Sequence, residues 1–204
     1  MQTKVLQADQ LETIQSYIQA GKVVAFPTDT VFGVGVRFDD EQALHALKQA
    51  KQRDSHKPIP MMVQNLVQMK QVADVDWRMD VLYKHFMPGA LTVVLNRKEN
   101  IPSYVSDGKK TIAIRIPDDA LLLELLANGP MLVTSANLSG ELPGKDEQEV
   151  LAQLDGRIDA IVKGKAKANI ASTIIDLTGE RITLLREGVY SLAQIEAVLK
   201  EEQR

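Results

Sequence analysis

Residues 22–35 read KVVAFPTDTVFGVG, and this stretch decides the fold. Its apolar, β-branched start predicts a buried strand, which ends at Pro27 because proline has no N–H for a central ladder. The polar Thr28–Thr30 then forms a strand-end loop, and Gly33 and Gly35 permit tight turning and close backbone approach. Ligands of open α/β sheets bind at the carboxyl ends of strands, so this loop is the first candidate for a binding site.

Composition narrows the class of protein. The chain has 204 residues, of which 45% are hydrophobic and 25% charged, as in an ordinary globular domain. It has no cysteine, which excludes disulfides, thiolate nucleophiles and cysteine-ligated zinc. No signal-peptide pattern is present, and the most apolar segment, Leu121–Leu126, is far shorter than the ~20 residues of a membrane helix. We therefore expect a cytoplasmic protein without a membrane span, and its net charge of −3 argues against broad coating of nucleic acid.

Helical and extended patterns alternate along the chain. Helices are expected from an Asp9 cap to Gly21, from an Asp39 or Asp40 cap to Lys51, and at Asn65–Ala73, Trp77–Phe86, Asp118–Ala127, Asp146–Leu154 and Leu192–Leu199. Strands are expected at Lys22–Phe26, Ile59–Val63, Leu91–Leu95, Thr111–Ile116, Met131–Thr134, Arg157–Val162, Thr173–Leu177 and Arg181–Leu185.

This interleaving predicts an α/β fold, of mixed α+β character, built on a twisted, mixed, mainly parallel sheet flanked by helices. We expect parallel neighbours at the centre of the sheet. The last two strands are separated by Thr178-Gly179-Glu180, which predicts a hairpin at one side. No internal repeat or linker divides the chain, so residues 1–204 are expected to form one domain with its core at about 9–200.

Basic residues gather where the second helix ends. Lys51 and Arg53 lie at its C-terminal turn and Lys57 follows shortly after, close to the loop after Phe26 if the helix packs back on that strand. Three cations there would form a site of the size of a phosphate group. The alternative is that they only complement the helix dipole.

Three further groups lie at strand ends. The sequence TSANLSG, Thr134–Gly140, follows an apolar strand and offers hydroxyl and amide donors. Ser172 opens the strand that begins at Thr173, and Arg186 stands beside Gly188 after the last strand. Each group alone is equally compatible with a turn or a cap.

Together these motifs resemble one family. VVAFPTDTVFGVG, AKQR, PGALTVVL, IAIRIP, VTSANLSG, STIIDLT and LLREGVY follow in this order, from about Lys22 to Tyr190, and resemble the YrdC-like threonylcarbamoyl-AMP synthases. The resemblance implies a single α/β domain with a concave, positively charged face. Because the chain ends at Arg204, soon after the last expected helix, it is similar to the short, single-domain form of the family.

The resemblance also implies a reaction. L-threonine, bicarbonate and ATP would give L-threonylcarbamoyladenylate and pyrophosphate, a nucleotidyl transfer that is the first step in modifying the adenosine beside the anticodon of tRNA. A separate transferase complex would then consume the adenylate. Positioning and charge neutralisation carry such chemistry. Mg²⁺ is expected on the phosphates of ATP, and no Asp/Glu cluster in the sequence marks a dedicated metal site.

Site residues follow from the same resemblance. The family's KxR and SxN elements fall on residues that would bind the nucleotide and stabilise transition-state charge: Lys51, Arg53, Ser135 and Asn137. The ATP site would be completed by Lys57, Thr111 and Arg186, and threonine would be held by Thr30, Arg115 and Ser172. The alternative for Arg115 is a structural ion pair with Asp118 or Asp119. Two positions depart from the family pattern, Phe32 in place of the usual Tyr and Met62 where many relatives have His.

A different class of function is a non-catalytic RNA- or nucleotide-binding paralogue on the same scaffold. Lys163, Lys165 and Lys167 would then form a strip facing tRNA or double-stranded RNA. A third reading is a carbamoyl-transferring relative, which the absence of cysteine and the short chain disfavour. Both KxR and SxN are retained, and this favours the enzyme.

Overall fold

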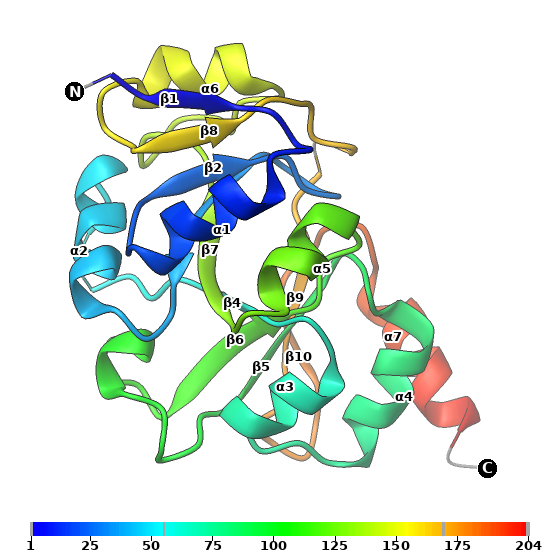
Figure 1. The fold of residues 1–204 in the computed structure, drawn as a ribbon. Helices are drawn as coiled ribbons and strands as arrows, with labels where there is room; N and C mark the ends of the chain where they lie inside the picture. The colour runs from blue at the N-terminus through cyan, green and yellow to red at the C-terminus, as the bar shows by residue number, and fades with distance from the viewer. Residues whose placement is uncertain (1, 55, 169, 203–204) are drawn as a thin grey trace.

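Ten strands form one mixed sheet in the computed structural model, which describes residues 2–54, 56–168 and 170–202 (Figure 1). In spatial order the strands are β1-β8-β2-β3-β7-β4-β6-β5-β9-β10. Their bounds are β1 Lys4–Leu6, β2 Val24–Phe26, β3 Gly33–Arg37, β4 Met61–Met62, β5 Leu91–Asn96, β6 Thr111–Arg115, β7 Met131–Ser135, β8 Ala160–Val162, β9 Thr173–Asp176 and β10 Thr183–Arg186.

Seven α-helices and one short 3₁₀ helix connect these strands within the described residues. They are α1 Leu11–Gln19, α2 Glu41–Ala50, α3 Leu66–Val72, α4 Trp77–Phe86, η1 Ser103–Ser106, α5 Ala120–Leu126, α6 Glu147–Leu154 and α7 Leu192–Glu201. No helix in this part of the chain has both the length and the apolar character needed to cross a bilayer.

Side-chain caps define where most of these helices begin. Asp40, Asn65, Asp76, Asp119, Asp146 and Ser191 each accept a hydrogen bond from a backbone N–H in the first turn of the helix that follows. The expected cap at Asp9 is wrong, because α1 begins after Gln10, which makes no side-chain cap bond. Of the two aspartates considered for α2, Asp40 is the cap, whereas Asp39 pairs with Arg37.

The sheet is mixed, as predicted, but it is not mainly parallel. Antiparallel pairs form its centre, since β3 runs antiparallel to both β2 and β7, and β7 runs antiparallel to β4. The expected hairpin is confirmed at the edge, where β9 and β10 pair antiparallel. Strand β1 was not predicted from the sequence. It pairs parallel with β8 at the other edge of the sheet.

The centre was predicted wrongly because β3 was expected to be a glycine-rich turn. Gly33 and Gly35 instead lie inside this strand, where neighbouring groups approach the backbone closely. A Cβ on Gly35 would lie 2.8 Å from the carbonyl oxygen of Leu132 and 2.8 Å from Cγ2 of Val133. Glycine therefore allows β2, β3 and β7 to pack tightly at this point.

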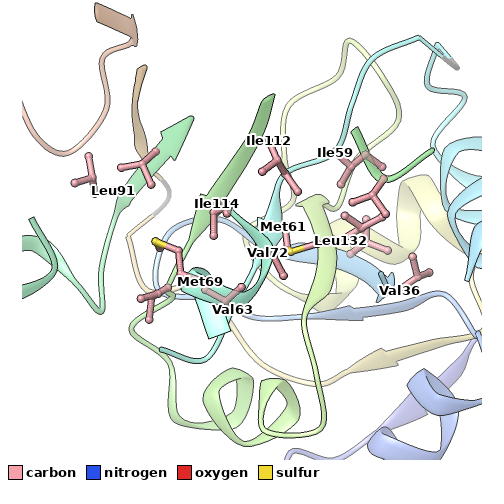
Figure 2. Close-up of a cluster of buried hydrophobic side chains, with 14 of the residues drawn as sticks. Val36, Ile59, Met61, Val63, Met69, Val72, Leu91, Ile112, Ile114 and Leu132 are labelled. Atoms are coloured by element: carbon pink, nitrogen blue, oxygen red, sulfur yellow. The ribbon is translucent and has the colours of Figure 1, made fainter. Parts of the chain in front are cut away.

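Alternate residues of the central strands pack into two hydrophobic cores, one on each face of the sheet. In β2, Val24 and Phe26 belong to the smaller core and Ala25 to the larger one. The larger core is completed by α2, α3, α4, α6 and α7, and Figure 2 shows part of it around Met61 and Ile114. The smaller core is covered by α1 and α5, which lie side by side in Figure 1.

Replacing Gly35 by Ala tests the tight packing of β3. We expect Gly35→Ala to lower the free energy of unfolding by about 1–3 kcal/mol, because the added methyl group overpacks a buried strand. Gly179→Ala is the matched control, since Gly179 lies in an exposed turn where the nearest atom to an added methyl carbon would be 3.8 Å away. The control should change stability by less than about 0.5 kcal/mol. Urea unfolding measures the free energy of unfolding of both variants. Equal changes in Gly35→Ala and Gly179→Ala would contradict tight packing at Gly35.

Candidate active site

A row of residues at matching register forms the floor of a cavity on the smaller-core face. Met62 of β4 pairs with Arg115 of β6, Arg115 with Thr92 of β5, and Thr92 with Ile174 of β9. Residues paired across neighbouring strands point to the same face of a sheet. The cavity has a volume of about 200 Å³. Its lining includes Thr28, Thr30, Val31, Gly33, Pro60, Met62, Thr92, Arg115, Val133, Thr134, Ser135, Pro143, Ala171, Ser172, Ile174 and Arg186.

The loop after β2 is held by its own hydroxyl groups. Thr28 Oγ1 donates to the carbonyl oxygen of Val31 (2.7 Å) and accepts from the backbone N–H of Thr30 (3.0 Å). The two threonine hydroxyls are 3.1 Å apart, and both side chains are buried. These contacts fix the position of the Thr30 hydroxyl beside the floor of the cavity.

Arg115 lies at the end of β6 and is 5% exposed. Its NH1 donates to Thr30 Oγ1 (2.7 Å), its NH2 to Asp29 Oδ2 (2.6 Å) and its Nε to the carbonyl oxygen of Gly89 (2.9 Å). Burial lowers the pKa of Arg115, and the neighbouring Asp29 carboxylate opposes that shift. The alternative pairing with Asp118 or Asp119 is wrong, since the ion-pair partner is Asp29.

A second polar group lies along β5 and β9. Ser172 Oγ and Thr92 Oγ1 are 2.8 Å apart and both side chains are buried. The guanidinium of Arg186 donates through Nε (3.1 Å) and NH2 (2.9 Å) to the carbonyl oxygen of Ser172. Gly188 allows this contact, because a Cβ there would overlap the carbonyl oxygen of Ala171. Arg186 and Arg115 therefore bring two cations to one cavity.

Lys51 follows the last residue of α2 and is 1% exposed. Its ammonium donates to the carbonyl oxygens of Ser135 and Asn137 (2.7 Å for the latter), and its own carbonyl accepts from the N–H of Ser139 (2.8 Å). These bonds tie the end of α2 to the loop after β7. Burial, with a smaller effect from Arg53, lowers the pKa of Lys51 to about 7.

The remaining predicted residues lie outside the cavity lining. Arg53 donates to the carbonyl oxygens of Lys57 (3.3 Å) and Pro58 (3.1 Å), and burial lowers its pKa. Asn137 donates through Nδ2 to two carbonyl oxygens of its own loop, while its buried Oδ1 has no partner among the described residues. Thr111 pairs with Asn96 at the opposite end of β6 from Arg115.

The structure thus divides the residues predicted from the sequence. Those that line the cavity are Thr30, Arg115, Ser135, Ser172 and Arg186, and those outside its lining are Lys51, Arg53, Lys57, Thr111 and Asn137. The roles of all ten stay predictions.

Sequence reasoning missed Thr92 and the pairing of Asp29. A hydroxyl in the middle of the apolar run LTVVL was a usable signal for Thr92. No local pattern indicates a contact between two residues that are 86 positions apart, such as Asp29 and Arg115.

Ionisable side chains do not suggest a metal centre here. Within residues 2–54, 56–168 and 170–202, no group of three or more His, Asp or Glu side chains is arranged to hold a metal ion.

The buried Lys51 predicts a pH dependence of stability. Its ordinary pKa is 10.5, so between about pH 7 and 10.5 the unfolded chain binds a proton that the folded chain lacks, and stability rises with pH. Lys51→Met removes this contribution but leaves the other titrating groups. We expect the unfolding free energy of the wild type, relative to Lys51→Met, to increase by up to about 1.4 kcal/mol per pH unit in this window. A difference that stays constant from about pH 7 to pH 10 in urea unfolding would contradict the lowered pKa.

Comparisons with known proteins identify the family and the fold. The family model Sua5_yciO_yrdC, described as "Telomere recombination", matches residues 16–188. Threonylcarbamoyl-AMP synthase of Pyrococcus abyssi is 35% identical over 189 residues, which are 91% of this chain and 56% of that protein. A putative threonylcarbamoyl-AMP synthase of Methanocaldococcus jannaschii is 34% identical over 91% of this chain and 88% of its own length. The chain thus spans about half the length of some curated relatives and most of others.

Solved structures share the fold. P. abyssi Sua5 complexed with L-threonine matches with a TM-score of 0.90 and 32% identity, over 98% of this chain and 60% of that one. Escherichia coli YciO matches with a TM-score of 0.84 and 26% identity, over 94% and 97% of the two chains. Since the family model covers most of the sequence and the relatives are more than 30% identical, the chain belongs to the Sua5/YciO/YrdC family.

Proposed function

We propose that this protein is a threonylcarbamoyl-AMP synthase, which converts L-threonine, bicarbonate and ATP to L-threonylcarbamoyladenylate and pyrophosphate. The observation that carries the proposal is the buried guanidinium of Arg115, held against Thr30 on the floor of a small cavity that also contains Ser172 and Arg186. Relatives about 35% identical are named for this activity.

The cavity is suited to an amino acid. Arg115 has five N–H donors, of which three have partners, so each terminal nitrogen keeps one N–H for a ligand. A guanidinium that offers two N–H groups is well matched to a carboxylate. The hydroxyls of Thr30 and Ser172 would provide further polar contacts to threonine. The solved complex of P. abyssi Sua5 with L-threonine supports this assignment.

ATP would lie toward the end of α2 and the loop after β7. Ser135 and Arg186 line the cavity and would meet the phosphates from inside it. Lys51, Arg53, Lys57, Thr111 and Asn137 are proposed to complete the nucleotide site beyond the cavity. Mg²⁺ would enter as the ion carried by ATP, because the described residues provide no cluster of carboxylates to hold it.

The chemistry then needs mainly position and charge. The amine nitrogen of threonine attacks the carbon of bicarbonate, water leaves, and a carbamate forms. A carbamate oxygen next attacks the α-phosphorus of ATP, the bond from that phosphorus to the bridging oxygen breaks, and pyrophosphate leaves. Arginine and lysine side chains can neutralise the charge on the phosphates in such a transfer. Holding the carbamate in line with the leaving oxygen supplies the remaining rate enhancement.

The proposed product would be the substrate of a later reaction that modifies tRNA. We propose that a separate transferase consumes the adenylate and modifies the adenosine beside the anticodon, and that both steps occur in the cytoplasm. The alternative RNA-facing lysine strip finds little support, because Lys167 donates to the carbonyl oxygen of Asp118 and pairs with Asp119 at 3.5 Å. A charge already engaged in this way contributes less to RNA binding.

An assay of pyrophosphate release tests the proposed function. We expect release from ATP only when L-threonine and bicarbonate are both present, because the carbamate is the nucleophile. With labelled bicarbonate, the label should appear in an adenylate separated by chromatography. Omitting either threonine or bicarbonate is the control. Equal ATP cleavage without threonine, or no adenylate at all, would rule out the synthase assignment.

A further inference from the structure

We propose that Asp29 is a positioning residue, which holds Arg115 in the orientation needed to bind the carboxylate of the amino-acid substrate. This inference rests on the proposed function of the cavity. Asp29 itself is not among the cavity-lining residues, so it would act through Arg115.

Geometry supports this role. Asp29 Oδ2 accepts from Arg115 NH2 at 2.6 Å, and the two side chains are 8% and 6% exposed. The other two acceptors on this guanidinium, the carbonyl oxygen of Gly89 and the hydroxyl of Thr30, are neutral. Asp29 is therefore the only carboxylate among the described residues that pairs with Arg115.

The charge balance of the cavity gives a second argument. Burial lowers the pKa of Arg115, and the nearby positive charge of Arg186 lowers it further. The Asp29 carboxylate acts in the opposite direction. Without it, two guanidinium groups would share the cavity without a nearby acid to offset them. Leaving one partner of a buried ion pair alone is unfavourable and encourages the side chain to rearrange.

Asp29 has one carboxylate oxygen that Arg115 does not use. Asp29 Oδ1 is buried and has no hydrogen-bond partner among the described residues. Such an oxygen costs stability, since buried polar atoms are normally paired. A local cost of this kind is common at residues that support a ligand site.

Replacing Asp29 by Asn is the direct test, because Asn keeps an acceptor oxygen and removes the charge. We expect the Kd for L-threonine, measured by calorimetry, to rise by about tenfold or more, where tenfold corresponds to 1.4 kcal/mol. The Kd for ATP should change by less than about twofold, and in the assay the KM for threonine should rise with kcat nearly unchanged, as expected when ground-state binding is lost. Thermal unfolding confirms that the variant is folded.

Asp39→Asn is the matched control. Asp39 forms a two-bond ion pair with Arg37, at 2.6 and 2.8 Å, but on the surface and away from the cavity. The Asp39→Asn variant should therefore have the same Kd for L-threonine and for ATP as the wild type.

Four further variants make the test independent of one substitution. If Asp29 acts through Arg115, then Asp29→Asn combined with Arg115→Lys should bind threonine no more weakly than Arg115→Lys alone, because neighbouring residues in one network are not additive. Should Asp29→Asn fail to fold, Asp29→Glu keeps the charge and is expected to retain more threonine affinity than Asp29→Ala.

The outcomes separate this inference from the proposed function. A wild type that binds threonine, with Asp29→Asn binding equally well, overturns the positioning role alone. The positioning role is also overturned if the loss of threonine-binding free energy in the double variant equals the sum of the losses in Asp29→Asn and Arg115→Lys. A wild type that binds no threonine overturns the proposed function and this inference together.

Discussion

The buried guanidinium of Arg115 is the interaction on which the cavity depends. It joins the loop after β2, the end of β6 and the segment before β5, which are distant in the sequence. A buried charge is stable only when it is paired and hydrogen-bonded, so these partners must converge for the fold to tolerate it. The same requirement brings these three segments together around one side chain.

Lys51 makes a comparable junction outside the cavity lining. It connects the end of α2 to the loop after β7 through carbonyl oxygens, so the cation is used to hold backbone in place. Because burial lowers its pKa to about 7, the protonation of this junction changes near neutral pH. Arg115 and Lys51 thus each join segments that no local sequence pattern connects.

Local patterns predicted the elements better than their arrangement. The helix from Trp77 to Phe86 and the β9–β10 hairpin follow from apolar periodicity, capping and turn residues, which act over a few positions. Strand direction at the centre depends on β3, whose glycines have no side chains to show an alternating pattern and therefore suggested a turn. The site residues came from the motifs. The alternative partners considered for Arg115, Asp118 and Asp119, are near it in sequence, whereas its ion-pair partner Asp29 is near it only in space.

The size of the cavity explains why the predicted residues separate into two sets. About 200 Å³ is less than the ~300–1,000 Å³ typical of pockets for larger ligands, so this space has the size for an amino acid and not for a whole nucleotide. An elongated triphosphate bound with its α-phosphorus at the cavity would have to extend outside it. Arg53 and Lys57 follow α2 and do not line the cavity, and they are proposed to supply counter-charges to such a ligand outside it. An amino-acid site in the cavity with the nucleotide site outside it would let pyrophosphate leave without passing through the cavity.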